Sequence, residues 1–391
     1  MNNKKIIPAP FAICFWLLIW LLPAITKGAE QTSTDVLFVA YDQGESNAFI
    51  QLHKQWDKQG ISYQILALGR AKSIFSGNSK LIDTDSLNLP ANLSTERNLL
   101  IDPDKLSQWA KNISPKIVYS GMASRAQAQI LNAFANNSVE KIAFYDNLDP
   151  LPNKEYTRPF LEEIQQVDEF HVSSSLTAES FQPTANATKA QVVVTGQPAF
   201  TAWDSIFNSN SKAKLRQELA LDKEDKVVVF AGDYGGDYPN SFEVFIKSTR
   251  LMPNTTFLVT HHPKYSGQLE QEAIDSFAGS NVRLIPKGTF STAELSTIAS
   301  AVVVHQSSIA QQALYKGIPV LYVAKSTFSN LLTEHHLAER AYTPESIKQA
   351  LLRIGNPKNK SLQDTLGIPK TPIDQVTQRI KSILLQEQNQ K

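Results

Sequence analysis

The sequence has almost no cysteine, since Cys14 is the only one in 391 residues. A disulfide, a thiolate nucleophile and a cysteine-ligated zinc site are therefore excluded from the rest of the chain. An excess of one charge is also lacking, because 38 Lys and Arg balance 37 Asp and Glu. That balance argues against a nucleic-acid binder and against an acidic disordered chain. Hydrophobic residues make up 42% of the chain, enough for a sizeable core.

The N-terminus carries a long uncharged run. Lys4 and Lys5 precede residues 6–26, which contain no charged side chain. A positive start, an apolar middle and small residues at the end are typical of a secretory signal peptide, although about 20 apolar residues can also span a bilayer. We therefore expect residues 1–29 to be a signal peptide or a membrane anchor. The rest of the chain is then either exported, to the periplasm or the extracellular space, or anchored at the inner membrane by residues 6–26.

The rest of the sequence alternates between strand and helix patterns. Short apolar runs are typical of strands that are buried on both faces of a parallel sheet. Such runs occur at residues 36–40, 63–68, 116–119, 141–145, 169–173, 191–195, 226–231, 256–260, 282–285, 301–304 and 318–323. The pattern predicts an α/β protein in which two doubly wound Rossmann-like domains face a central cleft.

The domain boundaries follow from the same pattern. A polar segment between the sixth and seventh apolar runs is expected to join the two halves, and residues 71–98 are expected to form an irregular surface segment. We place an N-terminal domain at 35–200, a linker at 201–221, a C-terminal domain at 222–355 and a tail with a terminal helix at 356–391.

Polar residues follow several predicted strands of the second half, at the strand ends where doubly wound sheets bind ligands. Ser307 and Ser308 precede a helix and suit a phosphate, with helix capping as the alternative. The glycines of residues 232–238 permit close backbone approach, although a plain turn would also need them. His262, followed by Pro263, could donate a hydrogen bond to an anion, whereas the proline could simply end the strand.

Acidic residues follow two predicted strands of the first half. Asp146 and Asp149 come directly after residues 141–145, and Asp42 and Glu45 lie in the loop after the first strand. A carboxylate that faces a substrate can act as a general base. Turn formation is the alternative for each of these clusters.

Several segments resemble a known superfamily. The run at residues 305–321 resembles the donor-side segment of GT-B glycosyltransferases and nucleotide-sugar 2-epimerases, with His305 and Gln312 where those proteins have Asp and Glu. The Val-Thr-Gly-Gln-Pro run at 194–198 resembles the passage where these enzymes leave the first half. The pair His262-Pro263 is similar to the His-Pro motif of bacterial sialyltransferases, capsule sugar transferases and polyol-phosphate transferases. Residues 145–149 more loosely resemble their acidic motif.

The resemblance implies roles for individual residues. Asp146 would activate the acceptor, and the donor would be held by a set of residues in the second half: Gly232, Gly235, His262, Pro263, His305, Ser307, Ser308 and Gln312. It implies transfer of a sugar from a nucleotide-sugar to an envelope glycan or lipid. The mechanism would be inverting and metal-independent, since the second half lacks an Asp-x-Asp motif, and we expect no cofactor. The alternative is an exported, non-catalytic, two-lobed ligand-binding protein, favoured by the export signal and by Gln312.

Overall fold

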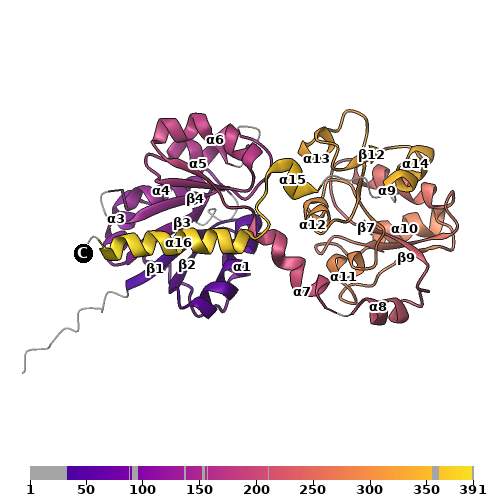
Figure 1. Ribbon diagram of the computed structural model, residues 1–391, viewed down its shortest axis with the longest axis horizontal. Helices are drawn as coiled ribbons and strands as arrows, with labels where there is room; N and C mark the ends of the chain where they lie inside the picture. Colours follow the sequence, from indigo (N-terminus) through magenta and orange to yellow (C-terminus); the bar gives the residue numbers. More distant parts are fainter. Residues whose placement is uncertain are drawn as a thin grey trace, which may run out of the picture.

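The computed structural model describes residues 33–87, 89, 96–135, 138–151, 155, 157–209, 211–354 and 361–389. The expected signal peptide or anchor at residues 1–29 lies outside these ranges. Among the described residues, no helix has both the length and the apolar character needed to cross a membrane. The chain forms two lobes that lie side by side, each built around its own sheet (Figure 1).

The N-terminal lobe contains six parallel strands in the order β2-β1-β3-β4-β5-β6. The strands are β1 (Ser33–Ala40), β2 (Tyr63–Ala67), β3 (Ser114–Gly121), β4 (Glu140–Phe144), β5 (Glu169–Val172) and β6 (Gln191–Val194). The helical segments are α1 (Gln43–Gln59), α2 (Ala71–Ile74), η1 (Asp85–Leu87), α3 (Pro103–Lys111), α4 (Arg125–Ala133), α5 (Arg158–Glu163) and α6 (Ser175–Thr188). Residues 36–40 of β1 are completely buried, which explains their continuous apolar run.

The C-terminal lobe contains six more parallel strands, in the order β12-β11-β10-β7-β8-β9. They are β7 (Lys226–Ala231), β8 (Thr255–Thr260), β9 (Val282–Leu284), β10 (Ala301–Val304), β11 (Val320–Val323) and β12 (Glu339–Ala341). The helices are α9 (Tyr238–Thr249), α10 (Gln268–Phe277), α11 (Thr292–Ser296), α12 (Ile309–Tyr315), α13 (Leu331–Glu334) and α14 (Pro344–Ile354). The two sheets confirm the predicted pair of doubly wound α/β domains.

The order of the strands determines where ligands can bind. In the N-terminal lobe β2 and β3 add to opposite sides of β1, and in the C-terminal lobe β8 and β10 add to opposite sides of β7. Doubly wound sheets bind ligands at such reversal points, beyond the carboxyl ends of the strands. The loops after β1, β3, β7 and β10 are therefore the expected positions of functional residues.

Two segments connect the lobes. The first consists of η3 (Pro198–Trp203), α7 (Asp204–Phe207) and α8 (Lys212–Glu218). The second contains α15 (Leu362–Leu366), after which α16 (Pro372–Asn389) runs back across the N-terminal lobe (Figure 1).

Helix α16 belongs to the core of the N-terminal lobe. Its Val376 and Ile380 are completely buried in the hydrophobic cluster that contains β1 and α1. The indole of Trp56 in α1 donates a hydrogen bond to the hydroxyl of Thr377, at 3.0 Å. Arg379 pairs with the buried carboxylate of Glu169 in β5.

The acidic segment of the N-terminal lobe reaches the C-terminal lobe. Leu148, in the loop after β4, is 1% exposed and lies in the hydrophobic cluster of the C-terminal lobe, which also contains Ala310 and Ala313 of α12. Helices α7, α12 and α15 occupy the space between the two sheets (Figure 1). The loop after β4 and the start of α12 therefore lie on the sides of the two lobes that face each other.

Candidate functional site

A cavity of about 760 Å³ lies at the carboxyl edge of the C-terminal sheet. We call it the strand-end pocket, because the loops after β7, β8, β9 and β10 all contribute to its lining. Five predicted donor-binding residues line it: Gly232, His262, Pro263, Ser307 and Ser308. The structure thus brings together residues that lie up to 76 positions apart in the sequence, from 232 to 308.

Position 232 requires a glycine because the backbone at the end of β8 packs directly against it. The amide of Gly232 donates to the carbonyl of Thr260 at 3.0 Å. A Cβ atom at this position would lie 2.4 Å from that carbonyl oxygen and 2.6 Å from Cα of His261. A side chain here would therefore separate the loops after β7 and β8, which together form one wall of the pocket.

The orientation of the His262 ring makes it a hydrogen-bond donor. The backbone amide of Lys264 donates to Nδ1 of His262 at 3.2 Å. Burial, and then the positive charge of Lys264, lower the pKa of His262 below its ordinary value. A neutral imidazole that accepts at Nδ1 carries its proton on Nε2. His262 can therefore donate from Nε2 to a ligand oxygen.

The segment after β9 also lines the strand-end pocket, and no motif marked it in the sequence. Lys287 donates from Nζ to the carbonyl of Pro263 at 2.9 Å, so its positive charge lies beside the His-Pro turn. Glu294 also lines the pocket, but its carboxylate accepts two hydrogen bonds from Ser291 in the capping box of α11. The only available signal for this segment was its place after the predicted strand at 282–285.

Ser307 and Ser308 lie at the start of α12. Ser308 is the N-cap residue but makes no side-chain capping hydrogen bond. Instead, Oγ of Ser307 accepts from the amide of Ile309 at 3.3 Å. The capping alternative therefore applies to Ser307, while both serines line the pocket.

Three predicted donor-binding residues lie outside the strand-end pocket. His305 is 5% exposed, beside the ring of Tyr238, and its Nδ1 has no partner among the described residues. Gly235 lines a neighbouring cavity on the other side of the loop after β7. Gln312 is half-buried in α12 and does not line the strand-end pocket.

In the N-terminal lobe, Asp42 and Glu45 form the capping box of α1. Asp42 also pairs with Arg97. Glu45 is 1% exposed, and its Oε1 accepts hydrogen bonds from the amides of Tyr41 and Asp42 and from Nε2 of Gln127. Both acidic residues therefore stabilise the start of α1. Glu45, expected in the loop after the first strand, lies in the first turn of this helix instead.

Asp146 lies next to this buried carboxyl group. A Cβ atom on Gly44 would lie 1.8 Å from Oδ2 of Asp146, and one on Gly121 would lie 1.8 Å from Oε2 of Glu45. The two glycines thus leave the space that the two carboxyl groups occupy. Burial, and then the negative charge of Asp146, raise the pKa of Glu45 to about 8. Glu45 is therefore mostly protonated at neutral pH.

Asp149 lies closer to the C-terminal lobe. Its carbonyl accepts a hydrogen bond from the hydroxyl of Tyr145 at 2.8 Å. Burial, and to a smaller extent the charge of Asp149, raise the pKa of Tyr322 in β11. Asp149 is therefore near the C-terminal lobe, whereas Asp146 lies near Glu45.

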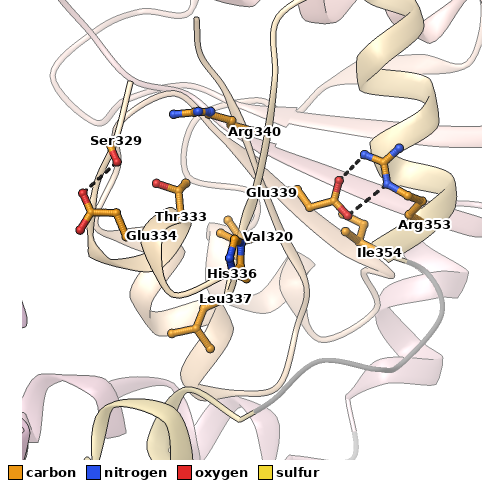
Figure 2. A pocket seen from close by; sticks show the side chains of 11 residues that line it. Val320, Ser329, Thr333, Glu334, His336, Leu337, Glu339, Arg340, Arg353 and Ile354 are labelled. Carbon is orange, nitrogen blue, oxygen red and sulfur yellow. Dashed lines mark hydrogen bonds and ion pairs between the residues drawn. The ribbon is translucent and has the colours of Figure 1, made fainter. Parts of the chain in front are cut away.

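A further cavity, of about 540 Å³, lies near β12, where Glu334 and Arg340 contribute to its lining (Figure 2). Its two carboxylates already have partners: Glu334 accepts a hydrogen bond from Ser329 at 2.9 Å, and Glu339 pairs with Arg353. Val320 and Glu339 lie at the amino ends of their strands, opposite the strand-end pocket. Across the described residues, no group of three His, Cys, Asp or Glu side chains could hold a metal ion.

Residues 29–311 match the protein family described as CDP-Glycerol:Poly(glycerophosphate) glycerophosphotransferase. No curated protein sequence matches the chain.

Solved structures show the same two-domain GT-B fold. The UDP complex of S. aureus MnaA is 14% identical, with a TM-score of 0.63 and coverage of 90% of this chain and 97% of that one. UDP-GlcNAc 2-epimerase from Neisseria meningitidis, bound to UDP-GlcNAc, is 13% identical, with a TM-score of 0.60 and coverage of 89% and 100%. The wall teichoic acid polymerase TagF is 10% identical, with a TM-score of 0.53 and coverage of 90% and 89%.

Proposed function

This chain belongs to the CDP-Glycerol:Poly(glycerophosphate) glycerophosphotransferase family, and from that premise we propose that it transfers a group from a nucleotide-activated donor to an acceptor of the cell envelope. The observation that carries the proposal is the strand-end pocket, where polar groups of four loops converge at the reversal point of a doubly wound sheet. The GT-B structures with bound UDP and UDP-GlcNAc support a nucleotide ligand.

The pocket suits the diphosphate of such a donor. His262 supplies an N–H group, Ser307 and Ser308 supply hydroxyls, and Lys287 supplies a positive charge. Charged and neutral donors of this kind form strong hydrogen bonds with phosphate oxygens. They would stabilise the negative charge that develops on a leaving diphosphate.

Asp146 is the proposed general base. It would accept the proton of the acceptor hydroxyl as that oxygen attacks the donor, while the bond to the diphosphate breaks. With a nucleotide-sugar, attack at the anomeric carbon from the opposite side inverts the configuration. The chain's own donors would neutralise the leaving group, which supports a mechanism that needs no metal ion.

Transfer of glycerophosphate is the second candidate, and the family match favours it. With CDP-glycerol, the acceptor oxygen would attack the phosphorus that carries glycerol, and CMP would leave. The same pocket would hold the nucleotide in both reactions. Incubation of the purified protein with UDP-GlcNAc and with CDP-glycerol, with release of UDP or CMP as the readout, distinguishes the two.

The test of nucleotide binding is thermal unfolding in the presence of UDP and CDP. A nucleotide at about 100 times its dissociation constant should stabilise the folded protein by about 2.7 kcal/mol. His262→Ala should lose most of this gain, because it removes the Nε2–H donor. If neither nucleotide changes the unfolding temperature of the unmodified protein at millimolar concentration, the assignment of the strand-end pocket is wrong.

The test of the base is Asp146→Asn. This variant should keep the nucleotide-induced stabilisation and lose at least about 100-fold in turnover, as expected when a general base is removed. Unchanged turnover would refute the role of Asp146. Nucleotide binding without turnover by the unmodified protein would favour the non-catalytic ligand-binding alternative.

An exported or membrane-anchored location is also part of the proposal, and it rests on the sequence of residues 1–29. Mass spectrometry of the N-terminus of the purified protein tests it. Loss of about 29 residues would support a cleaved signal peptide, whereas an intact N-terminus in the membrane fraction would support an anchor. An intact, freely soluble chain would contradict both.

A further inference from the structure

A third cavity of the C-terminal lobe, of about 460 Å³, lies between the loop after β7 and the start of α10. We call it the aromatic pocket; its lining includes residues 233–236 and 265–270. It is distinct from the strand-end pocket, since the two cavities share no lining residue. Gly235, expected from the sequence to bind the donor, lies here instead.

Exposed apolar side chains are concentrated at this cavity. Eight large apolar or aromatic side chains are exposed among the described residues, and three of them, Tyr234, Tyr265 and Leu269, line the aromatic pocket. The other five are spread over the chain: Leu81, Leu100, Leu251, Leu352 and Leu385. A single exposed apolar side chain is ordinary, whereas several such side chains around one cavity indicate a binding site.

The two tyrosine rings form one side of the aromatic pocket. Tyr234 is 47% exposed and Tyr265 is 52% exposed. Their ring centroids lie 5.9 Å apart, with 32° between the ring planes. Aromatic rings held in this way offer apolar faces together with polar hydroxyl tips. They suit a ligand that has both an apolar face and hydroxyl groups.

The polar groups of the pocket disfavour an anion. Asp233, Glu270 and Glu272 line it, and Nζ of Lys264 lies 5.2 Å from the Tyr234 ring centroid, outside this lining. Helix α10 begins without a side-chain cap, so its first amides are available as donors. The acidic Glu270, in the first turn of α10, already supplies the negative charge that such a helix start attracts. Glu270 is 3% exposed and already accepts a hydrogen bond from the hydroxyl of Tyr238 at 2.6 Å. Hydroxyl groups of a ligand can therefore use the first amides of α10 as donors and the exposed carboxylate of Glu272 as an acceptor.

We propose that the aromatic pocket binds a neutral sugar ring of a glycan, stacked against Tyr234 and Tyr265 and hydrogen-bonded to the start of α10 and to the carboxylate of Glu272. A pyranose ring has an apolar C–H face and a rim of hydroxyls, which match the two kinds of surface in the pocket. The ring of His262 lies 4.5 Å from the ring of Tyr234. Because His262 also lines the strand-end pocket, the bound sugar lies beside the proposed nucleotide site.

The test is calorimetric titration of the full-length protein with two neutral glycans, maltotriose and triacetylchitotriose. At least one should bind, and Tyr265→Ala should weaken its binding by about tenfold, the loss expected for one aromatic contact. Leu352→Ala is the matched control, because it removes an equally exposed side chain from α14, away from the pocket. It should leave binding unchanged.

The charge of the ligand provides a second comparison, between a neutral sugar and its phosphate ester. Glucose should bind more tightly than glucose 6-phosphate, because Asp233, Glu270 and Glu272 repel the phosphate. Equal or tighter binding of the phosphorylated sugar would contradict the proposal. So would the absence of binding by every neutral sugar, or binding of tetramethylammonium alone, which would identify a cation site between tyrosines.

The sugar site and the proposed transfer reaction can fail separately. Ser308→Ala should weaken nucleotide binding and leave glycan binding within about twofold, because Ser308 lines the strand-end pocket and not the aromatic pocket. Glycan binding that survives Tyr265→Ala unchanged would overturn the sugar site, whatever the nucleotide result. Thermal unfolding of each variant without ligand verifies that it is folded.

Discussion

The buried carboxyl group of Glu45 makes the stability of the protein depend on pH in a way that one substitution should remove. Burial and the nearby charge of Asp146 raise the pKa of Glu45 from 4.5 to about 8. A raised pKa means that the folded state binds a proton more tightly than the unfolded state between these two values. The free energy of unfolding therefore falls as the pH rises through this range.

Glu45→Gln keeps the shape of the protonated side chain and cannot ionise. Its carbonyl oxygen can still accept from Tyr41, Asp42 and Gln127. Relative to the unmodified protein, the variant should gain about 3 kcal/mol between pH 4.5 and pH 7, and a further 1 to 2 kcal/mol, roughly, by pH 9. Titrating groups that do not interact with Glu45 are common to both proteins and cancel in the difference.

The assay is urea unfolding of both proteins at intervals between pH 4.5 and pH 9. Gln43→Ala, at the exposed start of the same helix, removes no ionisable group and serves as the control. A stability difference between Glu45→Gln and the unmodified protein that stays constant over this range would refute the reasoning. It would mean that Glu45 is ionised in the folded protein.

Two further substitutions test the docking of α16 onto the N-terminal lobe and the contact between the two lobes. Burial opposes ionisation of Glu169, but hydrogen bonds from His171 and Arg379 lower its pKa to about 2; Arg379→Ala should therefore cost about 3 to 5 kcal/mol at pH 7. In urea unfolding this cost should shrink as the pH falls from about 4.5 toward 2, and a cost independent of pH would contradict the pairing. Leu148→Ala should cost about 2 to 5 kcal/mol, whereas the exposed Leu352→Ala should cost little; equal losses would argue against the interlobe contact of Leu148.

Much of the fold could be predicted because buried parallel strands leave a clear pattern. Every apolar run assigned as a strand is a strand in the structure. The clearest runs belong to β1, β7 and β10, which are buried along almost their whole length. Strand β12, with Glu339 and Arg340 in its three residues, lacks such a run and was not recognised. Glu45 was expected in the loop before α1 rather than in its first turn, because the capping box of α1 consists of polar residues that also suit a loop.

Contacts between distant segments could not be predicted in the same way. The terminal helix was expected, but its docking onto β1 and α1 depends on side chains such as Val376 and Ile380 that meet the core only in three dimensions. Residues 71–98 were expected to form a surface segment, yet Phe75 and Leu87 are buried. A single apolar residue in a polar stretch gives no periodic signal, so its burial cannot be inferred from the sequence.

The residues of the candidate site also fall into those that the sequence predicted and those that it did not. Residues marked by recognisable motifs, such as His262 and Ser307, line the strand-end pocket, whereas Lys287 lies in a loop with no motif and was missed. His305 and Gln312 follow the same motif pattern but do not line the pocket. A motif identifies the strand end, while the direction of each side chain depends on the local backbone.

The central claim is that a nucleotide diphosphate binds where the loops after β7, β8, β9 and β10 meet. Amide hydrogen exchange with and without CDP or UDP tests it most directly, because the method locates the protected backbone. Slower exchange is predicted at residues 232–236, 260–264, 285–294 and 305–310, with the peripheral strands unaffected. Protection confined to other segments, or none at saturating nucleotide, would contradict the account.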